Sequence, residues 1–577
     1  SEVCELGIAW TKIEGISGIR FMVVEESSMT VEAEGTYSRL GAGESGISIK
    51  VYSDAGYTIL EASTSYSDIT SLEVSGLAAN TTYYISANSR NGAGVENEWY
   101  GTSETAVSTT TRIERVTGLE FSGVEKTSLR VDHIGEYTNL DITGSGINTE
   151  CSGINIYGVS FSTESGWKNE KGQWEISYLK PNSEYKFIGN SRNSVGRESG
   201  KTIEISTYTR SSAPTTITVN TQKTSADIVW NSGYPENPQH TEYYVETSSI
   251  SDAGPYAAAS VWQLDVSTKV FGLSPNRRYY FRVKSKNMVN VDSDWSGVYS
   301  GYTKIEEPGV LRYSGIGYDS LKVSVDTSSV SNLDDGLSGI RFKNESTGDI
   351  SNSPTGWQAI CEWEDTGLEQ NTTYQYSAQT RNGEGIPSDK VYGEIICTLV
   401  APATGVIISE ISETGITARA AGVFPDNLGL GESGIYLEAT DLGLYSSSTW
   451  RNDNVDREFV GLATNSVYYL RANTRNRIGV LQSTSTYRSV YTYAAVPGIV
   501  RLATSTYQPG ELRVTGIVEN TNPVGTEYSI EMSSDMGFGV YDYITSTGGI
   551  MGAAGWESIW SYPVVIKGLA ANSTYYF

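Results

Sequence analysis

One block of sequence recurs six times in this chain of 577 residues, and each copy begins at a leucine. The first copy runs from Leu77 to Gly94, and the last is cut short by the end of the chain at Phe577. The six marker leucines are Leu77, Leu179, Leu273, Leu368, Leu462 and Leu569. They are roughly 95 to 105 residues apart, whereas solenoid units are about 20–50 residues long. The sequence therefore predicts a tandem array of small domains.

Within each copy, two sets of residues alternate along the chain. In the fifth copy, one set is Tyr468, Leu470, Ala472 and Thr474, and the other is Tyr469, Arg471, Asn473 and Arg475. This alternation is typical of a strand with one face in a core and the other in water. The preceding Leu-x-x-Asn predicts a tight corner, because Asn tolerates left-handed backbone angles. The following Arg-Asn-x-x-Gly predicts a turn into the next strand.

A tyrosine opens each of these expected strands, directly after the corner. The six residues are Tyr83, Tyr185, Tyr279, Tyr374, Tyr468 and Tyr575. A Tyr in this place matches the tyrosine corner of immunoglobulin-like sandwiches, in which the hydroxyl group bonds back to the chain just upstream. We therefore expect a structural role for all six.

The repeats resemble fibronectin type III domains, and the resemblance covers nearly the whole chain. It is best in the third repeat, where Pro214 lies near the start, Trp230 lies in an expected strand over residues 226–230, and Leu273 and Tyr279 follow. The other repeats lack a Trp at the place of Trp230, and Asn290 stands where four other copies have Gly. The chain has 60 Gly and 39 Tyr and no stretch of sustained helical periodicity. The expected fold is all-β, a linear tandem array of fibronectin type III-like β-sandwiches.

Two further motifs set the expected domain boundaries. A Gly begins the first strand of five repeats, at Gly18, Gly118, Gly309, Gly405 and Gly498, and Thr215 takes this place in the third. A Ser-Gly-Ile motif is expected to begin the third strand, at Ser45, Ser152, Ser338 and Ser433. The resulting domains are 1–16 (terminal strand of a preceding repeat), 17–113, 114–211, 212–305, 306–401, 402–495 and 496–577 (an incomplete sixth repeat). Short linkers with Pro predict a semi-rigid rod.

Both ends of the sequence look cropped from a longer array. Residues 1–12 resemble the last strand of a preceding repeat, and Phe577 interrupts a strand that five other copies complete. An alternative is that the two incomplete ends complement each other between subunits in a head-to-tail fibre. The single strand at the start would not replace all that the sixth repeat lacks, so cropping is the preferred interpretation.

The resemblance to fibronectin type III repeats implies an extracellular or cell-surface protein, and the composition limits its partners. The net charge is −26, a field that repels nucleic acid and anionic membranes. No apolar run approaches the roughly 20 residues that span a bilayer, so no direct membrane insertion is expected here. Four cysteines, Cys4, Cys151, Cys361 and Cys397, are too few for a disulfide-based scaffold. Cys361 is expected before the fifth strand of its repeat and Cys397 in the seventh, and whether they pair is left open.

Residues for catalysis are hard to find. The two histidines are in different repeats, with His133 expected at a surface or edge and His240 in a solvated loop, and neither has a nucleophile at a recognisable spacing. Two Gly-x-Gly-x-x-Gly matches, beginning at Gly41 and Gly429, run into strands and are interpreted as turns rather than dinucleotide sites. We expect no catalytic residue, no cofactor and no metal. Calcium at loop carboxylates is a weaker alternative, the candidates being Asp334, Asp335, Asp426 and Glu432.

A Trp recurs shortly before the marker leucine, with Tyr66 in its place in the first repeat. These residues are Trp167, Trp262, Trp357, Trp450 and Trp556. One interpretation is packing against the sandwich, which every domain would need. The other is an exposed aromatic contact surface that stacks on sugars or on a neighbouring copy. Asn-x-Ser/Thr sequons occur at Asn80, Asn344, Asn371 and Asn572, and three of these are the corner Asn itself. The tripeptide Leu264–Val266 resembles an integrin-binding motif, but three residues within an expected strand are too few to be informative.

The leading hypothesis is a non-catalytic structural protein of the cell surface or an extracellular filament, whose partners are neighbouring copies of itself. The first alternative is an adhesin that binds glycans or a receptor, and the divergent loop at residues 234–240 of the third repeat is the first place to test for it. The second alternative is a set of accessory repeats of a secreted carbohydrate-active enzyme. Fold analogy alone supports these functions, and it is a weak basis for choosing among them.

Overall fold

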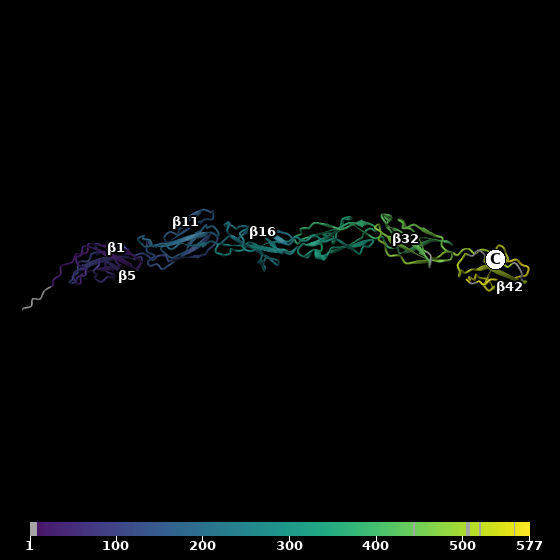
Figure 1. Ribbon diagram of the computed structural model, residues 1–577, viewed down its shortest axis with the longest axis horizontal. Coiled ribbons are helices and arrows are strands. Elements are labelled where there is room, and N and C mark those ends of the chain that lie inside the picture. The colour runs from purple at the N-terminus through teal and green to yellow at the C-terminus, as the bar shows by residue number, and fades with distance from the viewer. Residues whose placement is uncertain (1–7, 442–444, 504–507, 518–520, 559) are drawn as a thin grey trace, which may run out of the picture. The chain divides into compact units, whose positions relative to one another are not determined.

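The computed structural model describes residues 8–441, 445–503, 508–517, 521–558 and 560–577 (Figure 1). The chain divides into two compact units. The first comprises Ser1–Ser274 with Arg278–Thr303, and the second comprises Pro275–Arg277 with Lys304–Phe577. Over the described residues, each unit contains three hydrophobic cores, and each core lies between antiparallel sheets. We number these six small sandwiches 1 to 6 in chain order.

Sandwich 1 shows the strand order that sandwiches 2, 3 and 5 share. One sheet has the order β1-β2-β5 and the other β4-β3-β6-β7, so the chain crosses between the sheets after β2, β4 and β5. The strands are β1 (Gly18–Val24), β2 (Ser28–Glu34), β3 (Gly46–Tyr52), β4 (Leu60–Ser63), β5 (Ser71–Ser75), β6 (Thr82–Arg90) and β7 (Ser108–Thr110). The two sheets face each other with their apolar residues inward, as in immunoglobulin-like sandwiches.

Sandwiches 2 and 3 complete the first unit with the same arrangement. Sandwich 2 has β8 (Gly118–Ser122), β9 (Ser128–Ile134), β10 (Gly146–Ile154), β11 (Ser160–Glu164), β12 (Trp174–Ser177), β13 (Glu184–Arg192) and β14 (Ile205–Tyr208). Sandwich 3 has β15 (Thr215–Thr221), β16 (Ser225–Asn231), β17 (Glu242–Ser248), β18 (Ala257–Ala258), β19 (Ser267–Phe271), β20 (Arg278–Lys286) and β21 (Tyr299–Tyr302).

The second unit contains sandwiches 4, 5 and 6. Sandwich 4 has β22 (Arg312–Ser314), β23 (Ser320–Ser324), the 3-10 turn Thr327–Ser329, β24 (Gly339–Asn344), β25 (Glu362–Thr366), β26 (Thr373–Tyr374), β27 (Tyr376–Arg381), β28 (Val391–Tyr392) and β29 (Ile396–Cys397). Sandwich 5 has β30 (Gly405–Ile411), β31 (Gly415–Ala421), β32 (Gly434–Thr440), β33 (Tyr445–Ser447), β34 (Arg457–Val460), β35 (Val467–Arg475) and β36 (Arg488–Tyr491). Sandwich 6 has β37 (Val500–Leu502), β38 (Glu511–Ile517), β39 (Ile530–Met532), β40 (Asp542–Ile544), β41 (Ile550–Met551) and β42 (Val564–Lys567). In sandwich 4 the second sheet is divided into β24-β27-β28 and β26-β29, and in sandwich 6 it has the order β39-β40-β41.

The all-β prediction and the period-two alternation are confirmed. In β35 the residues predicted to face the core, Tyr468, Leu470, Ala472 and Thr474, are all buried. In β20 the buried Phe281 and Val283 alternate with the less buried Arg282 and Lys284 in the same way. The corner prediction is also confirmed, because the corner Asn has a positive φ in all six copies, at Asn80, Asn182, Asn276, Asn371, Asn465 and Asn572.

Four local predictions are wrong. Ser152–Ile154 is the end of β10, which begins instead at Gly146, because the sequence Ser-Gly-Ile occurs twice in that strand region and the earlier copy follows the turn. The first strands of sandwiches 4 and 6 begin at Arg312 and Val500, later than the glycines chosen for them. Residues 264–266 form a bend rather than a strand.

The fourth error concerns His133, which is half-buried rather than exposed. It lies on β9 on the same face as the buried Leu129 and Val131, and its Nε2 is 2.6 Å from Thr149 Oγ1 in the facing sheet. Burial lowers the pKa of this imidazole, so the neutral form is favoured. His240 is exposed, as the sequence predicted.

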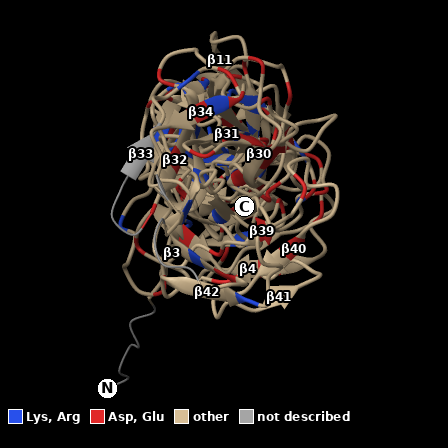
Figure 2. Ribbon diagram, turned by 90° about the vertical axis from the view of Figure 1, so that its right-hand side faces the viewer, with Lys and Arg blue, Asp and Glu red and all other residues tan. Residues whose placement is uncertain are grey.

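Positive and negative residues are mixed along the strands, as the blue and red segments of Figure 2 show. Many of them pair across neighbouring strands, for example Arg282 of β20 with Glu246 of β17 at 2.6 Å. Such pairs are partly exposed and contribute about 0–1 kcal/mol each to stability. Within the described ranges, no helix has the length and apolar character needed to cross a membrane.

Candidate functional site

The recurring aromatic residues pack against a basic side chain of their own sandwich. The basic residue is the Arg or Lys just before the turn Asn, 13 positions after the marker leucine in each of the five copies that extend this far. The pairs, with the distance from the cation to the ring centroid, are Tyr66–Arg90 (4.0 Å), Trp167–Arg192 (4.6 Å), Trp262–Lys286 (4.8 Å), Trp357–Arg381 (4.7 Å) and Trp450–Arg475 (4.5 Å). Each such contact contributes about 0.5–1 kcal/mol at a partly exposed site.

The glycine of the Ser-Gly-Ile motif makes room for this stacking. In sandwich 2, Gly146 of β10 pairs with Arg192 of β13, and a Cβ on Gly146 would lie 3.1 Å from Cβ of Trp167. The indole therefore lies across β10 and reaches the guanidinium group of the next strand. Trp167, Trp262, Trp357 and Trp450 are all half-buried, whereas Trp556 is 64% exposed. One ring face is thus occupied within the sandwich wherever the basic partner is found.

Sandwich 3 extends this pair into a ladder of alternating cations and rings. Arg282 lies 4.0 Å from the ring centroids of both Tyr256 and Trp295, and Lys284 lies 4.8 Å from that of Trp295. Tyr244 stacks on Trp262 with their ring centroids 5.1 Å apart. Because each cation also pairs with a carboxylate of a neighbouring strand or turn, the ladder stabilises the face of the β17-β20 sheet.

The six tyrosines that follow the corners, from Tyr83 to Tyr575, each make the same kind of hydrogen bond. In each copy the phenol oxygen accepts a hydrogen bond from the backbone N–H of the residue directly after the marker leucine, five positions upstream. The donors are Ala78, Lys180, Ser274, Glu369, Ala463 and Ala570, at 2.6–3.0 Å. This bond closes the corner and holds the backbone of the Leu-x-x-Asn segment beside the strand that follows it.

The corner Asn joins consecutive sandwiches, a role that the sequence did not reveal. Between sandwiches 1 and 2, Asn80 Nδ2 donates to the carbonyl oxygen of Asn139 at 2.6 Å, and Asn80 Oδ1 accepts from the N–H of Ser194 at 2.8 Å. From the other side, Asn193 Nδ2 donates to the carbonyl oxygen of Thr111 at 2.9 Å. Asn80 and Asn193 are both fully buried. The joint is therefore a closed set of hydrogen bonds between side chains and backbone.

The same joint recurs elsewhere within each unit. Between sandwiches 2 and 3, the bonds are Asn182 Nδ2 to Thr241 Oγ1 (2.8 Å), Met288 N–H to Asn182 Oδ1 (2.9 Å) and Asn287 Nδ2 to Thr209 O (3.1 Å). Between sandwiches 4 and 5, they are Asn371 Nδ2 to Asn427 O (2.9 Å), Arg477 N–H to Asn371 Oδ1 (2.7 Å) and Asn476 Nδ2 to Thr398 O (3.1 Å). Asn465 Nδ2 donates to Thr526 Oγ1 across the next joint. In the first sandwich, Asn91 Nδ2 likewise donates to the carbonyl oxygen of Thr11, at 3.0 Å.

Three of the four sequons have no room for a glycan in the folded protein. Asn80 and Asn371 use their amide nitrogen across a joint, and Asn344 uses its own inside the core of sandwich 4. All three are fully buried, whereas Asn572 is exposed. The recurrence of Asn at the corner and in the turn could have indicated the joints. Turn geometry, however, was already a sufficient reason to find Asn at both places.

The cysteines and acidic loops form no recognisable reactive centre. Cys151, Cys361 and Cys397 are buried free thiols, so Cys361 and Cys397 do not pair, and Cys4 lies outside the described residues. Burial raises the pKa of Cys151 to about 12, which keeps the thiol protonated and unreactive. Among the described residues, no group of three or more His, Cys, Asp or Glu side chains is placed to hold a metal ion.

The environment of Glu345 leads us to expect that sandwich 4 loses stability in acid. Its carboxylate accepts hydrogen bonds from Lys343 Nζ (2.7 Å), Ser377 Oγ (2.6 Å) and Lys390 Nζ (3.2 Å), and these lower its pKa from 4.5 to about 2. Because the pKa is lower in the folded state, the stabilisation is present above pH 4.5 and is lost as the pH falls towards 2. We expect a loss of about 1–2 kcal/mol over this window. The melting temperature of Glu345→Gln should therefore fall less steeply below pH 4.5 than that of the unchanged protein.

The matched control for this prediction is Glu364→Gln, which alters an exposed carboxylate of the same sandwich. The melting temperature of this control should fall with acid as steeply as that of the unchanged protein. If it falls as little as that of Glu345→Gln, Glu345 is not the responsible group.

No protein-family model and no curated protein matches the sequence. Among solved structures, the chain is similar to the FN1–FN3 domains of chicken CNTN1, with 15% identity and a TM-score of 0.18 over 49% of this chain and 99% of that one. It is also similar to a two-domain fibronectin type III segment of chicken tenascin, with 18% identity and a TM-score of 0.23 over 33% of this chain and 99% of that one. By its own strand order and its separate cores, the chain is a tandem array of fibronectin type III-like β-sandwiches.

Proposed function

We propose that the protein is a non-catalytic structural protein of the cell surface or of an extracellular filament, and that neighbouring copies of the same protein are its partners. The observation that carries this proposal is the recurring joint. In three joints the Asn of one corner and the Asn of the next sandwich's turn both bond across the boundary, and both are buried. A joint of this kind resists bending, because bending would leave buried polar groups without partners.

Each sandwich also has its own core, so that mechanical load on one sandwich need not unfold its neighbours. The repeated domains would supply length, and the joints would transmit direction. The aromatic rings stacked on Arg or Lys support the same interpretation, since they stabilise every sandwich in the same way instead of forming one distinctive site.

Electron microscopy of the native protein tests the proposal. We expect filaments in which neighbouring copies associate, with a regular repeat along their length. Separate particles that never associate would contradict the filament proposal and favour the alternative function, an adhesin that acts as a single chain.

The stiffness of a joint is tested by Asn80→Gly. Glycine adopts the positive φ of 45° without strain, so this change removes only the side-chain bonds to Asn139 and Ser194. We expect the joint to lose about 1–3 kcal/mol. The test uses spin labels at the exposed positions Glu73 and Glu120, with Cys4 replaced by Ser. Double electron–electron resonance should then show a broader distribution of distances between the labels in Asn80→Gly.

The control is Asn290→Gly, which changes an exposed Asn with a φ of 62° in a turn of sandwich 3. It should leave the distance distribution between sandwiches 1 and 2 unchanged. If Asn80→Gly also leaves it unchanged, the joint bonds do not determine the stiffness, and the mechanical argument fails.

A further inference from the structure

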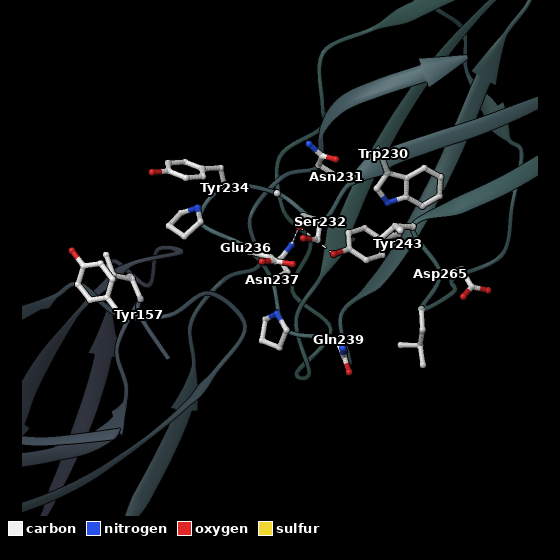
Figure 3. Close-up of a pocket in the computed structure, with 16 residues that line it drawn as sticks. Tyr157, Trp230, Asn231, Ser232, Tyr234, Glu236, Asn237, Gln239, Tyr243 and Asp265 are labelled. Carbon is white, nitrogen blue, oxygen red and sulfur yellow. Dashed lines mark hydrogen bonds between the residues drawn. The ribbon is translucent and has the colours of Figure 1, made fainter. Parts of the chain in front are cut away.

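A cleft of about 970 Å³ lies between sandwiches 2 and 3, inside the first unit (Figure 3). Its volume falls within the range of about 300–1,000 Å³ that is usual for ligand sites. We call it the 2–3 cleft. One wall is the turn after β10, and the other is the loop between β16 and β17 together with the bend before β19. The residues that carry the argument are Tyr157, Trp230, Asn231, Tyr234, Glu236, Gln239, Leu264 and Asp265.

Two tyrosine rings from different sandwiches are exposed at the cleft. Tyr157 of sandwich 2 is 79% exposed, and Tyr234 of sandwich 3 is 82% exposed. Figure 3 shows both rings at one end of the cleft, whereas Trp230 and Tyr243 lie at the other end. Leu264, on the bend, is 57% exposed. Aromatic rings with a polar tip are suited to a ligand that has both apolar faces and hydrogen-bonding groups.

The polar side chains of the cleft are amides and carboxylates. Asn231, Gln239, Glu236 and Asp265 are all exposed, and no Lys or Arg is among the lining residues. The carboxylates accept hydrogen bonds, and the amides both accept and donate them. Because two carboxylates line the cleft against one nearby cation, Lys126, in a protein of net charge −26, an anionic ligand would be repelled. The chemistry of the lining suits a neutral ligand with many hydroxyl groups.

Trp230 lies at the end of the cleft away from the two exposed tyrosine rings. The ring is 98% buried, with 2% relative exposure, and its Nε1–H has no hydrogen-bond partner in the structure. Its neighbour Tyr243 differs, because the hydroxyl group of Tyr243 donates to the carbonyl oxygen of Ser232 at 3.1 Å. Because Nε1 has almost no exposed surface and the ring belongs to the core of sandwich 3, we expect a ligand to contact the exposed tyrosines, amides and carboxylates of the cleft instead.

The walls of the cleft are held in place by bonds of their own. Asn155 Oδ1 accepts from the N–H groups of Tyr157 and Val159, at 3.0 and 3.1 Å, and so fixes the turn that presents Tyr157. Asn237 Oδ1 accepts from the N–H of Ser212 at 2.7 Å and anchors the opposite loop. Lys126 Nζ of sandwich 2 donates to the carbonyl oxygen of Tyr234 at 3.2 Å and connects the two walls. A ligand would therefore lose little free energy in ordering the site.

We propose that the 2–3 cleft binds a neutral oligosaccharide. The C–H faces of the sugar rings stack on Tyr157 and Tyr234, and the hydroxyl groups bond to Glu236, Asp265 and the neighbouring amides. This binding function goes beyond the structural role proposed above, and it belongs to this one junction, because the loop 234–240 has two prolines, Pro235 and Pro238, whereas the corresponding loops of the other repeats have at most one.

Isothermal titration of the full chain tests the proposal. The probes are four neutral tetrasaccharides, built from glucose in α-1,4 or β-1,4 linkage, from mannose and from N-acetylglucosamine, together with a tetragalacturonate as the anionic comparison. We expect at least one neutral probe to bind with a Kd of about 0.1–1 mM and the tetragalacturonate not to bind. Failure of every neutral probe to bind at about 10 mM would overturn the proposal.

Variants place the binding in the 2–3 cleft. Tyr157→Ala and Tyr234→Ala change exposed rings, so both variants should fold, and each should weaken the affinity about tenfold. The control, Phe271→Ala, removes a ring of sandwich 3 that is 73% exposed and lies outside the cleft, and it should bind as the unchanged protein does. Sugar binding that both tyrosine variants retain in full would overturn the assignment. So would tyrosine-dependent binding of a Lys- and Arg-rich peptide in place of every sugar.

Discussion

Replacing Phe281 by Ala is expected to lower the free energy of unfolding of sandwich 3 by about 3–5 kcal/mol. Phe281 lies on β20 and is fully buried in a core that includes Ile228, Val245 and Val283. Truncation removes the ring from this core and leaves a cavity that the two sheets close only in part. Because a domain of this size is stable by about 5–15 kcal/mol, the loss is a large share of the total.

The effect should be confined to sandwich 3, because the other sandwiches have separate cores. Hydrogen exchange of the full chain, resolved by peptide, should show faster exchange in β16, β17 and β20 and little change in sandwich 1. The control is Phe271→Ala on β19 of the same sandwich, which removes a ring that is 73% exposed and should cost less than about 0.5 kcal/mol. Equal effects of the two changes, or a loss spread over all sandwiches, would contradict the assignment of independent cores.

The second large effect concerns a polar cluster inside sandwich 4. Asp365 of β25 is 4% exposed, and it occupies the core position that is held in other sandwiches by Val74, Ile176, Val270, Phe459 and Ile566. Its carboxylate accepts hydrogen bonds from Tyr376 Oη at 2.8 Å and from Asn344 Nδ2 at 2.9 Å. Burial raises the pKa of the Tyr376 phenol, so this group stays protonated and remains a donor.

Tyr376→Phe is expected to lower the free energy of unfolding of sandwich 4 by about 1.5–3 kcal/mol. The change removes one of the two side-chain donors to a buried carboxylate, and little water is available to replace it. Thermal unfolding with a probe specific to sandwich 4 measures the loss. Tyr392→Phe is the control, because Tyr392 lies on β28 of the same sandwich and is 56% exposed.

Replacing the whole cluster by apolar residues separates two contributions to the stability of sandwich 4, the cost of desolvating the polar groups and the gain from packing. The triple variant Asp365→Val, Tyr376→Phe and Asn344→Val restores the kinds of residue that the other sandwiches have at these places. It should be as stable as the unchanged protein or more stable by about 1–4 kcal/mol, since no buried polar group is left without a partner. A triple variant less stable than Tyr376→Phe alone would show that the cluster stabilises the fold by its shape rather than imposing a desolvation cost.

The repeat period, the alternation of buried and exposed residues and the corner at each Asn could be predicted from the sequence. These features depend on residues close together in the chain, since strand pleating sets the period of two and a left-handed residue sets the corner. The strand that contains Trp230 and the places of Cys361 and Cys397 relative to the strands of sandwich 4 could also be predicted from local sequence. The exact strand starts did not, because Ser-Gly-Ile is compatible with either end of β10.

The partners of these residues across space were decided by the tertiary structure. Trp167 and Arg192 meet because β10 and β13 are neighbours, and Asn80 reaches Asn139 because sandwiches 1 and 2 are in contact. The polar cluster around Asp365 and the 2–3 cleft arise in the same way, from segments far apart in the chain. Local periodicity specifies which face of a strand is buried, but it carries no information about which side chain another sheet or sandwich places opposite that face. The sequence by itself therefore determined the repeated β-sandwich, and the tertiary structure alone decided the joints, the stacked pairs and the cleft.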